Sequence, residues 1–219
     1  MAERFADRME AGRVLAEKLI PRYGNRGDLV ILGLPRGGIP VAYEVAHALN
    51  APLDVFVVRK LGTPGREELA MGAIASGGLV VINDDVVESL GISRKAIAAE
   101  IISERAELER REAAYRGNRG RLNLAGKVVI LVDDGLATGS TMHAAMAAAR
   151  RESPSRIVVA VPVASAPTYA EFRSIADECF CVITPEPFRA VGCWYTNFSQ
   201  ITDDEVREVL ETAWARELR

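Results

Sequence analysis

The sequence predicts an α/β fold in which a mainly parallel sheet carries helices on both faces, with a small hood region. Short runs of apolar, largely β-branched residues alternate with longer segments whose apolar residues recur at helical spacing. Glycine-rich or acidic turns follow several of these apolar runs. The chain has 219 residues, 49% of them hydrophobic, which is enough for one such domain with its own core. We therefore expect a single domain over residues 1–219.

The expected elements follow from these patterns in order along the chain. Phe5, Met9, Leu15 and Leu19 indicate a helix that ends near Pro21, and a strand at about 28–32 leads into the turn at 33–38. The next expected elements are a helix at 40–49, a strand at 53–58, a long mobile connection at 59–78, a strand at 79–82 and a helix capped by Ser93 that extends to about 116. The last are a strand at 128–132, an Ala-rich helix at 142–150, a strand at 156–162, a helix at 167–176, a strand at 178–183 and a helix from about 203.

The segment 128–141 gives the clearest indication of function. A five-residue apolar strand ends in Asp133 and Asp134, and a turn containing Gly135 leads into a helix. The first turn of a helix has unpaired N–H groups and the positive end of the helix dipole, so it can bind a phosphate. The residues predicted to hold that phosphate are Ala137, Thr138, Gly139, Ser140 and Thr141. The two carboxylates would repel a phosphate and are better suited to accept hydrogen bonds from sugar hydroxyls, or to hold Mg²⁺ through water. Together these features predict a ribose 5-phosphate site.

The order Asp-Asp-Gly-x-Ala-Thr-Gly-x-Thr after an apolar strand closely resembles the signature of type I phosphoribosyltransferases. The resemblance extends from the loop at 33 to the strand near 183. It implies Mg²⁺-dependent transfer of ribose 5-phosphate from 5-phospho-α-ribosyl 1-pyrophosphate (PRPP) to a nitrogenous acceptor such as a nucleobase, with release of pyrophosphate. Asp133 and Asp134 would position the ribose, no side chain would ligate the metal directly, and a homodimer is expected. Related enzymes that act on hypoxanthine and guanine have an Asp at the position of Ala137, so this residue argues against their chemistry.

Other segments fit the same site. The loop formed by Pro35, Arg36, Gly37 and Gly38 follows the first strand, and the resemblance implies that it binds pyrophosphate and contains a non-proline cis peptide. The connection at 59–78 resembles the flexible loop that closes over the active site. The resemblance makes Lys60 a further catalytic candidate that would contact the pyrophosphate, with Arg66 as a weaker candidate for the same contact. Asp84 and Asp85 follow another strand and are expected to cap a helix.

The segment 184–219 is expected to form most of the hood over a sheet edge, with 1–24 as a further candidate. Val191, Trp194 and Tyr195 are candidates for contacting the acceptor base. Aromatic side chains such as these, with Phe198, can stack on a base or simply pack the hood against the core, and the sequence leaves both interpretations open.

Composition narrows the remaining classes of function. The net charge is -3 and no long basic block occurs, so we expect no nucleic-acid partner. The charged N-terminus and short apolar runs predict a cytoplasmic protein with no membrane segment. Three cysteines give no disulfide framework, and Cys179 and Cys181 are expected on one face of a strand. Two alternatives stay open: a non-catalytic regulator that binds PRPP or a nucleotide, and a hydrolase or phosphatase acting on sugar phosphates.

Overall fold

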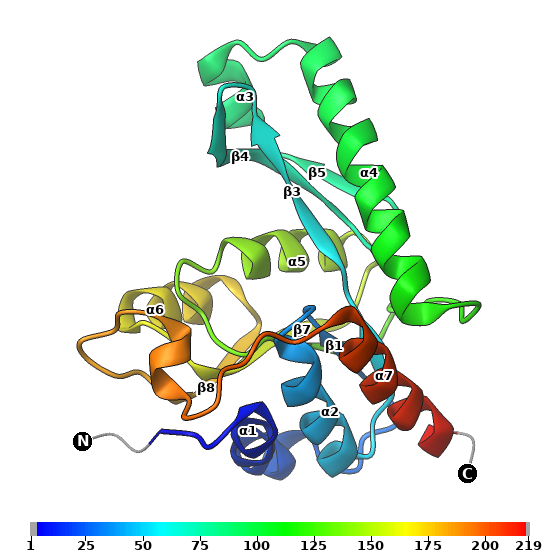
Figure 1. Cartoon of the computed structure of the whole chain (residues 1–219), viewed down its shortest axis with the longest axis vertical. Coiled ribbons are helices and arrows are strands. Elements are labelled where there is room, and N and C mark those ends of the chain that lie inside the picture. Colours follow the sequence, from blue (N-terminus) through cyan, green and yellow to red (C-terminus); the bar gives the residue numbers. More distant parts are fainter. Residues whose placement is uncertain (1–3, 218–219) are drawn as a thin grey trace.

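A five-stranded sheet forms the centre of the structure, and all of its neighbouring strands are parallel (Figure 1). The computed structural model describes residues 4–217, except for the side chains of residues 66–68 and 217. The strands in spatial order are β2 (Leu53–Val55), β1 (Leu29–Gly33), β6 (Val128–Val132), β7 (Arg156–Val163) and β8 (Glu178–Ile183). Because β1 and β6 are adjacent, the turns that follow them meet at the same edge of the sheet.

Helices cover both faces of this sheet, as the sequence predicted. The helices α1 (Arg8–Tyr23) and α2 (Gly38–Leu49) lie on one face, and α5 (Ser140–Arg150) and α6 (Ala166–Ile175) lie on the other (Figure 1). Alternate residues of β1 enter different cores: Leu29 and Ile31 pack with α1 and α2, whereas Val30 and Leu32 pack with α5 and α6. Burial on both faces explains why the strands are continuous apolar runs without a polar alternation.

A second, smaller sheet projects from the main body (Figure 1, top). Its antiparallel strands are β3 (Val58–Thr63), β4 (Arg66–Ala75) and β5 (Leu79–Ile82), in that spatial order. The helices α3 (Asp84–Leu90) and α4 (Arg94–Arg116) follow in the chain and complete the projection. We call residues 58–116 the arm. The predicted fold class is confirmed, but this small sheet lies at 58–82, whereas the hood was expected mainly at 184–219.

The expectation of a long connection without secondary structure at 59–78 is wrong, because β3 and β4 form a hairpin there. Its glycines suggested a loop, yet only some of them serve a turn. Gly65 has φ +75 in the turn after Pro64, whereas Gly72 lies inside β4. A Cβ on Gly72 would come within 2.4 Å of the Val81 carbonyl oxygen on β5, so this glycine permits close contact between strands.

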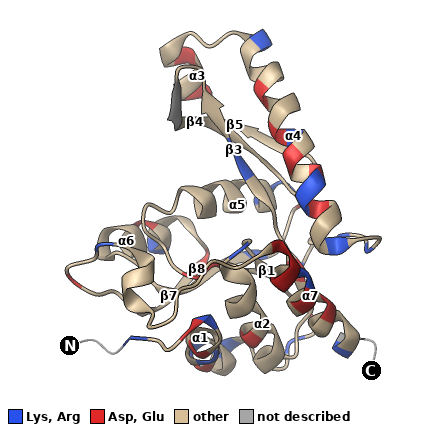
Figure 2. Cartoon of the chain, in the orientation of Figure 1, with Lys and Arg blue, Asp and Glu red and all other residues tan. Residues whose placement is uncertain are grey.

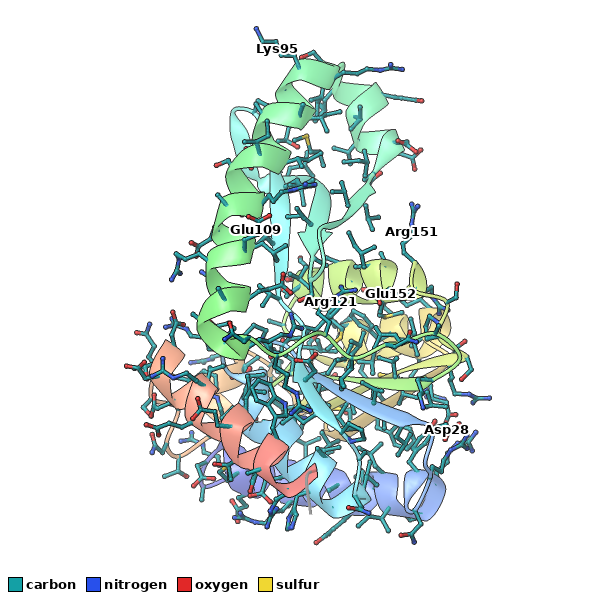
Figure 3. The ribbon with its side chains drawn as sticks, turned by 90° about the vertical axis from the view of Figure 1, so that its right-hand side faces the viewer. Asp28, Lys95, Glu109, Arg121, Arg151 and Glu152 are labelled. Carbon is teal, nitrogen blue, oxygen red and sulfur yellow. The ribbon has the colours of Figure 1, made fainter. Side chains whose placement is uncertain are left out.

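Buried polar contacts attach the arm to the main body. The guanidinium of Arg116, at the end of α4, donates to the Asp54 carboxylate of β2 at 2.9 Å, and both side chains are 5% exposed. The Tyr115 hydroxyl donates to Asp203 of α7 (Asp203–Glu217) at 2.8 Å. In Figure 3, Lys95 lies at the far tip of the arm, while Arg121 and Glu152 lie together where the chain returns to the body. These two side chains form an ion pair of 3.1 Å.

Of the two capping predictions for the arm, the one for Ser93 is confirmed and the one for Asp84 and Asp85 is wrong. Ser93 caps α4 and accepts from the Ala96 N–H at 3.2 Å. Asp84 and Asp85 lie in the first turn of α3, whose cap is Asn83. Acidic and basic residues alternate along α4 (Figure 2), as expected for a solvated helix face.

The C-terminal segment lies along two parts of the main body. The helix α7 packs against α2 and the edge strand β2, and the Trp214 indole N–H donates to the Leu53 carbonyl at 2.9 Å. Residues 184–202 contain the short 3₁₀ helix η1 (Val191–Trp194) and join the N-terminal segment, where the Phe5 N–H donates to the Trp194 carbonyl at 3.0 Å. Whether this segment covers an acceptor remains a prediction.

Several helix ends differ from their expected positions: α2 and α5 each begin two residues earlier than expected. The first helix continues past Pro21 to Tyr23, and the Gly24 N–H still donates to the Ile20 carbonyl at 2.9 Å. None of the described helices is long and apolar enough to cross a membrane.

Candidate functional site

Asp133 and Asp134 directly follow β6, and nearby groups fix each of them. The Asp134 N–H donates to Asp133 Oδ1 at 2.8 Å, and the Tyr195 hydroxyl donates to the Asp134 carbonyl at 2.6 Å. The guanidinium of Arg8 in α1 donates from Nε to Asp134 Oδ2, also at 2.8 Å. One oxygen of each carboxylate, Asp133 Oδ2 and Asp134 Oδ1, therefore lacks a hydrogen-bond donor among the described residues.

Burial is the main electrostatic influence on this pair. It raises the pKa of Asp133 well above its usual value, and the neighbouring charge of Asp134 raises it further. Burial also raises the pKa of Asp134, although the hydrogen bond and charge of Arg8 act in the opposite direction. The pKa of the Tyr195 hydroxyl is raised as well, first by burial and then by the adjacent Asp134 carboxylate.

The loop after the carboxylates presents free backbone donors. No acceptor in the described part of the chain pairs with the N–H groups of Ala137, Thr138 or Gly139. Gly139 has φ +72 and precedes α5, and a Cβ there would lie 2.4 Å from the Phe172 ring. The hydroxyls of Thr138 and Ser140 lie 3.1 Å apart. Thr141 is in the first turn of α5. This is the arrangement of N–H groups and hydroxyls that binds a phosphate.

Contacts on the other side of the loop keep its backbone in place. The Thr168 hydroxyl at the start of α6 donates to the Ala137 carbonyl at 2.6 Å. The Leu136 N–H donates to the Val163 carbonyl at the end of β7 at 2.9 Å. Neighbouring elements thus hold the Ala137 carbonyl and the Leu136 N–H, while the N–H groups of residues 137–139 stay available.

The loop after β1 touches the carboxylates. The Leu34 N–H donates to the Val132 carbonyl at 2.9 Å, and the Pro35–Arg36 peptide bond is cis, as the resemblance implied. A Cβ on Gly37 would lie 1.9 Å from Asp134 Oδ2, and one on Gly38 would lie 2.7 Å from the Val132 carbonyl oxygen. The Arg36 side chain is 37% exposed, so a ligand can reach it. Its guanidinium lies 3.9 Å from the Asp203 carboxylate. Loops 33–38 and 133–141 therefore form one site at the carboxyl edge of the sheet.

A family model described as "Phosphoribosyl transferase domain" matches residues 2–195. The chain belongs to this family. A Mycobacterium tuberculosis (strain H37Rv) protein named "Putative phosphoribosyl transferase Rv0571c" is 47% identical over 209 residues, which are 95% of this chain and 47% of that protein. The phosphoribosyl transferase domain described here thus spans about half the length of the curated relatives that it matches across its length.

Two further comparisons agree with this family. An orotate phosphoribosyltransferase of Staphylococcus haemolyticus is 29% identical over 85 residues, which are 39% of this chain and 41% of that protein. The crystal structure of TT1426 from Thermus thermophilus is similar to this phosphoribosyl transferase domain with a TM-score of 0.86 and 41% identity, over 94% of this chain and 97% of that one. The match over residues 2–195 shows the family, and the similarity to TT1426 shows the fold.

Lys60 lies in the arm, beside α5. It is exposed on β3 and lines a cavity of about 520 Å³ between the arm and α5, together with Ser140, His143, Asp84 and Asp85. This cavity includes Ser140 of the first turn of α5, and its lining contains no residue of the 35–38 loop. Arg66, the weaker candidate, lies in β4, and its side chain is outside the described residues.

The candidate base-contacting residues pack closely against the site. Tyr195 is 3% exposed, and its ring packs near Phe5 and Phe198. Val191 lies over the Gly135 turn, where a Cβ would come within 2.6 Å of it. The half-buried Trp194 belongs to the same apolar cluster. The sequence left two interpretations of these aromatic residues, stacking on a base or packing against the core. Tyr195 packs against the core in this structure.

Arg8 is a site residue that sequence reasoning missed. It precedes Asp134 by 126 positions, and no motif links the two residues. The available signal was a charged residue at the head of the apolar stripe that continues through Leu15 and Leu19 in α1. A buried charge at such a position needs a partner of opposite sign.

The carboxylates fit a magnesium ion that is held largely by other ligands. No group of three or more His, Cys, Asp or Glu side chains in the described residues could hold a metal by itself. The free oxygens of Asp133 and Asp134 would hold the ion through water, and a bound phosphorylated ligand would have to supply the direct ligands.

The cysteines form a structural feature apart from this site. Cys179 and Cys181 lie on one face of β8, as predicted, and burial raises the pKa of each thiol to about 12. Such thiols stay protonated at neutral pH and are poor nucleophiles.

Proposed function

We propose that this chain transfers the 5-phosphoribosyl group of PRPP to a nitrogenous acceptor, such as a nucleobase, and releases pyrophosphate. The observation that carries the proposal is the contact between the two loops: the carboxylates at 133–134, the free N–H groups at 137–139 and the loop at 35–38 share one sheet edge. A ligand with a phosphate at one end, a sugar diol in the middle and a pyrophosphate at the other end matches that order.

Each part of the site would act on one part of the donor. The loop at 137–141 would bind the 5-phosphate through N–H groups and hydroxyls, and the free oxygens of Asp133 and Asp134 would accept from the ribose hydroxyls. Arg36 and the backbone at 35–38 would stabilise the departing pyrophosphate. Bound Mg²⁺ would supply charge neutralisation at the pyrophosphate and the ribose hydroxyls. The bond from the anomeric carbon to pyrophosphate oxygen breaks, a bond to the acceptor nitrogen forms, and the acceptor proton leaves to solvent.

Pyrophosphate release from PRPP tests the proposal directly. The assay would contain Mg²⁺ and a panel of purines, pyrimidines and small amines, with calorimetric binding of PRPP alone measured in parallel. Acceptor-dependent release of pyrophosphate would support a transferase and identify the acceptor class. Tight binding without turnover on any acceptor would favour the non-catalytic regulator, and release of inorganic phosphate would favour the hydrolase. Absence of PRPP binding would reject the proposed site.

The two ends of the donor can be separated with Thr138→Val and Lys60→Ala. Thr138→Val removes a hydroxyl from the phosphate loop, and we expect ribose 5-phosphate affinity to fall by about tenfold, because hydrogen bonds to charged groups contribute roughly 1.5–3 kcal/mol. Lys60 is exposed, and ribose 5-phosphate lacks the pyrophosphate that this residue is proposed to contact. Its removal should therefore change the affinity by less than about threefold. Calorimetry with ribose 5-phosphate would give both values. A larger loss for Lys60→Ala would show that the proposed orientation of the ligand is wrong.

A further inference from the structure

Arg8 is held more rigidly than an ordinary surface arginine. Its Nε donates to Asp134 Oδ2 at 2.8 Å and its Nη1 donates to the Ser199 carbonyl at 2.9 Å. Its guanidinium lies 3.9 Å from the centroid of the Phe198 ring. The residue is 8% exposed. A guanidinium that is buried, stacked and hydrogen-bonded on both sides has little rotational freedom, so it can fix the position of its carboxylate partner.

Within the described residues, three of the four polar groups of Asp134 form hydrogen bonds, each with a different residue. Arg8 takes Oδ2, Tyr195 takes the backbone carbonyl, and the backbone N–H is used by Asp133. The remaining group is Oδ1, and Asp133 likewise keeps Oδ2 free within the same part of the chain. Two free carboxylate oxygens on adjacent residues match the two vicinal hydroxyls of a ribose.

The charges around Arg8 also show that its contact with Asp134 is specific. Asp7, Glu205 and Glu208 line a cavity of about 260 Å³ together with Arg8, yet its ion pair is with Asp134. The guanidinium also offsets the charge of two adjacent carboxylates that must stand beside an anionic ligand. Without it, Asp133 and Asp134 would repel each other and the ligand.

We propose that Arg8 is a positioning residue of the ribose site: by holding Asp134 Oδ2, it leaves Asp134 Oδ1 and Asp133 Oδ2 fixed to accept the two ribose hydroxyls. This inference rests on the proposed function, because it assigns the sugar to these carboxylates. It adds that helix α1 and the segment 195–199, which lie far apart in sequence, jointly determine sugar affinity.

The test compares a sugar phosphate with a bare phosphate. Calorimetry would measure ribose 5-phosphate and inorganic phosphate binding to the wild type, Arg8→Met and Arg8→Lys. Arg13→Met is the matched control, because Arg13 lies in the same helix but pairs with Glu44 on the surface, with 58% of its own side chain exposed. Circular dichroism would verify that each variant is folded.

We expect Arg8→Met to lose about tenfold or more in ribose 5-phosphate affinity, while phosphate affinity changes by less than about twofold. Arg8→Lys should recover part of the loss, since it keeps the charge but not the planar fork. Arg13→Met should match the wild type. If Arg8→Met does not fold, the same two affinities can be measured for Arg8→Lys and Phe198→Ala. Each of these substitutions is a smaller change that still weakens the contact between residue 8 and Asp134.

Three results would overturn the inference and leave the proposed function standing. Equal losses for phosphate and ribose 5-phosphate would show a merely structural role, and unchanged sugar affinity would show no role at all. Tighter sugar binding would show that Arg8 competes with the ribose for Asp134. A wild type that binds neither probe would reject the proposed function and this inference with it, so the two failures are distinguishable.

Discussion

Replacement of both Asp133 and Asp134 by asparagine is expected to lower ribose 5-phosphate affinity by about a hundredfold or more. Each substitution removes the charge from a proposed acceptor of a ribose hydroxyl, and hydrogen bonds to charged groups contribute roughly 1.5–3 kcal/mol apiece. Two such losses correspond to about 10²–10⁴ in affinity if they add. Calorimetry with ribose 5-phosphate measures the effect, and PRPP turnover should fall at least as much.

The fold should survive this double substitution. Asparagine keeps the shape of aspartate and an oxygen that can accept from Arg8. Burial raises the pKa of both carboxyls, so the native protein binds more protons than the unfolded chain above the ordinary carboxyl pKa of about 4. Wild-type stability should therefore fall as the pH rises through that range, and the double variant should lack this part of the pH dependence. Thermal unfolding at several pH values would check it.

Asp84→Asn with Asp85→Asn provides the matched control. This pair also follows a strand, but it lies exposed in the first turn of α3 and forms no ion pair among the described residues. We expect its removal to change ribose 5-phosphate affinity by less than about twofold. Comparable losses for the two pairs would mean that general charge, and not the position of Asp133 and Asp134, governs binding.

The main sheet could be predicted because its signals are local. The run at 128–132 is apolar at every position, and the structure has β6 over the same residues. Alternation of such runs with helical segments is sufficient to predict parallel order. The turn before α5 was predictable for the same reason, since its glycine, its hydroxyls and the helix start are contiguous in the chain. That this turn binds a phosphate stays a prediction.

Features that depend on contacts between distant segments were not predictable. Gly72 suggests a loop in the sequence, yet in the structure it lies inside β4 and allows β5 to lie close to that strand. Arg8 has no motif, and its role arises only when α1 packs beside the end of β6. Tyr195 could stack on a base or pack inward, and only the fold shows its hydroxyl on the Asp134 carbonyl. The residues of one loop are contiguous and can be recognised from the sequence. The residues that hold the loop in place lie in other parts of the chain, so the sequence does not reveal them.

Gly37→Ala is expected to damage the sugar site through a single methyl group. The added Cβ would lie 1.9 Å from Asp134 Oδ2, 2.7 Å from its Cγ and 3.2 Å from Arg8 Nε. The carboxylate cannot keep its position at that separation, so the ion pair with Arg8 must shift. A misplacement of about 1 Å in a binding group can cost roughly a hundredfold, and we expect ribose 5-phosphate affinity to fall by about ten- to a hundredfold.

The backbone itself gives no reason for Gly37→Ala to unfold the protein. Gly37 has φ -62 and ψ -31, a helical conformation that alanine adopts readily. Gly120→Ala is the matched control, because a Cβ there meets nothing within 4 Å and its φ is not in the left-handed region. Calorimetry should show wild-type affinity for Gly120→Ala and the large loss for Gly37→Ala, with both variants folded by circular dichroism. Wild-type affinity in folded Gly37→Ala would mean that Asp134 can leave its observed position without penalty, and that its contact with the 35–38 loop does not define the sugar site.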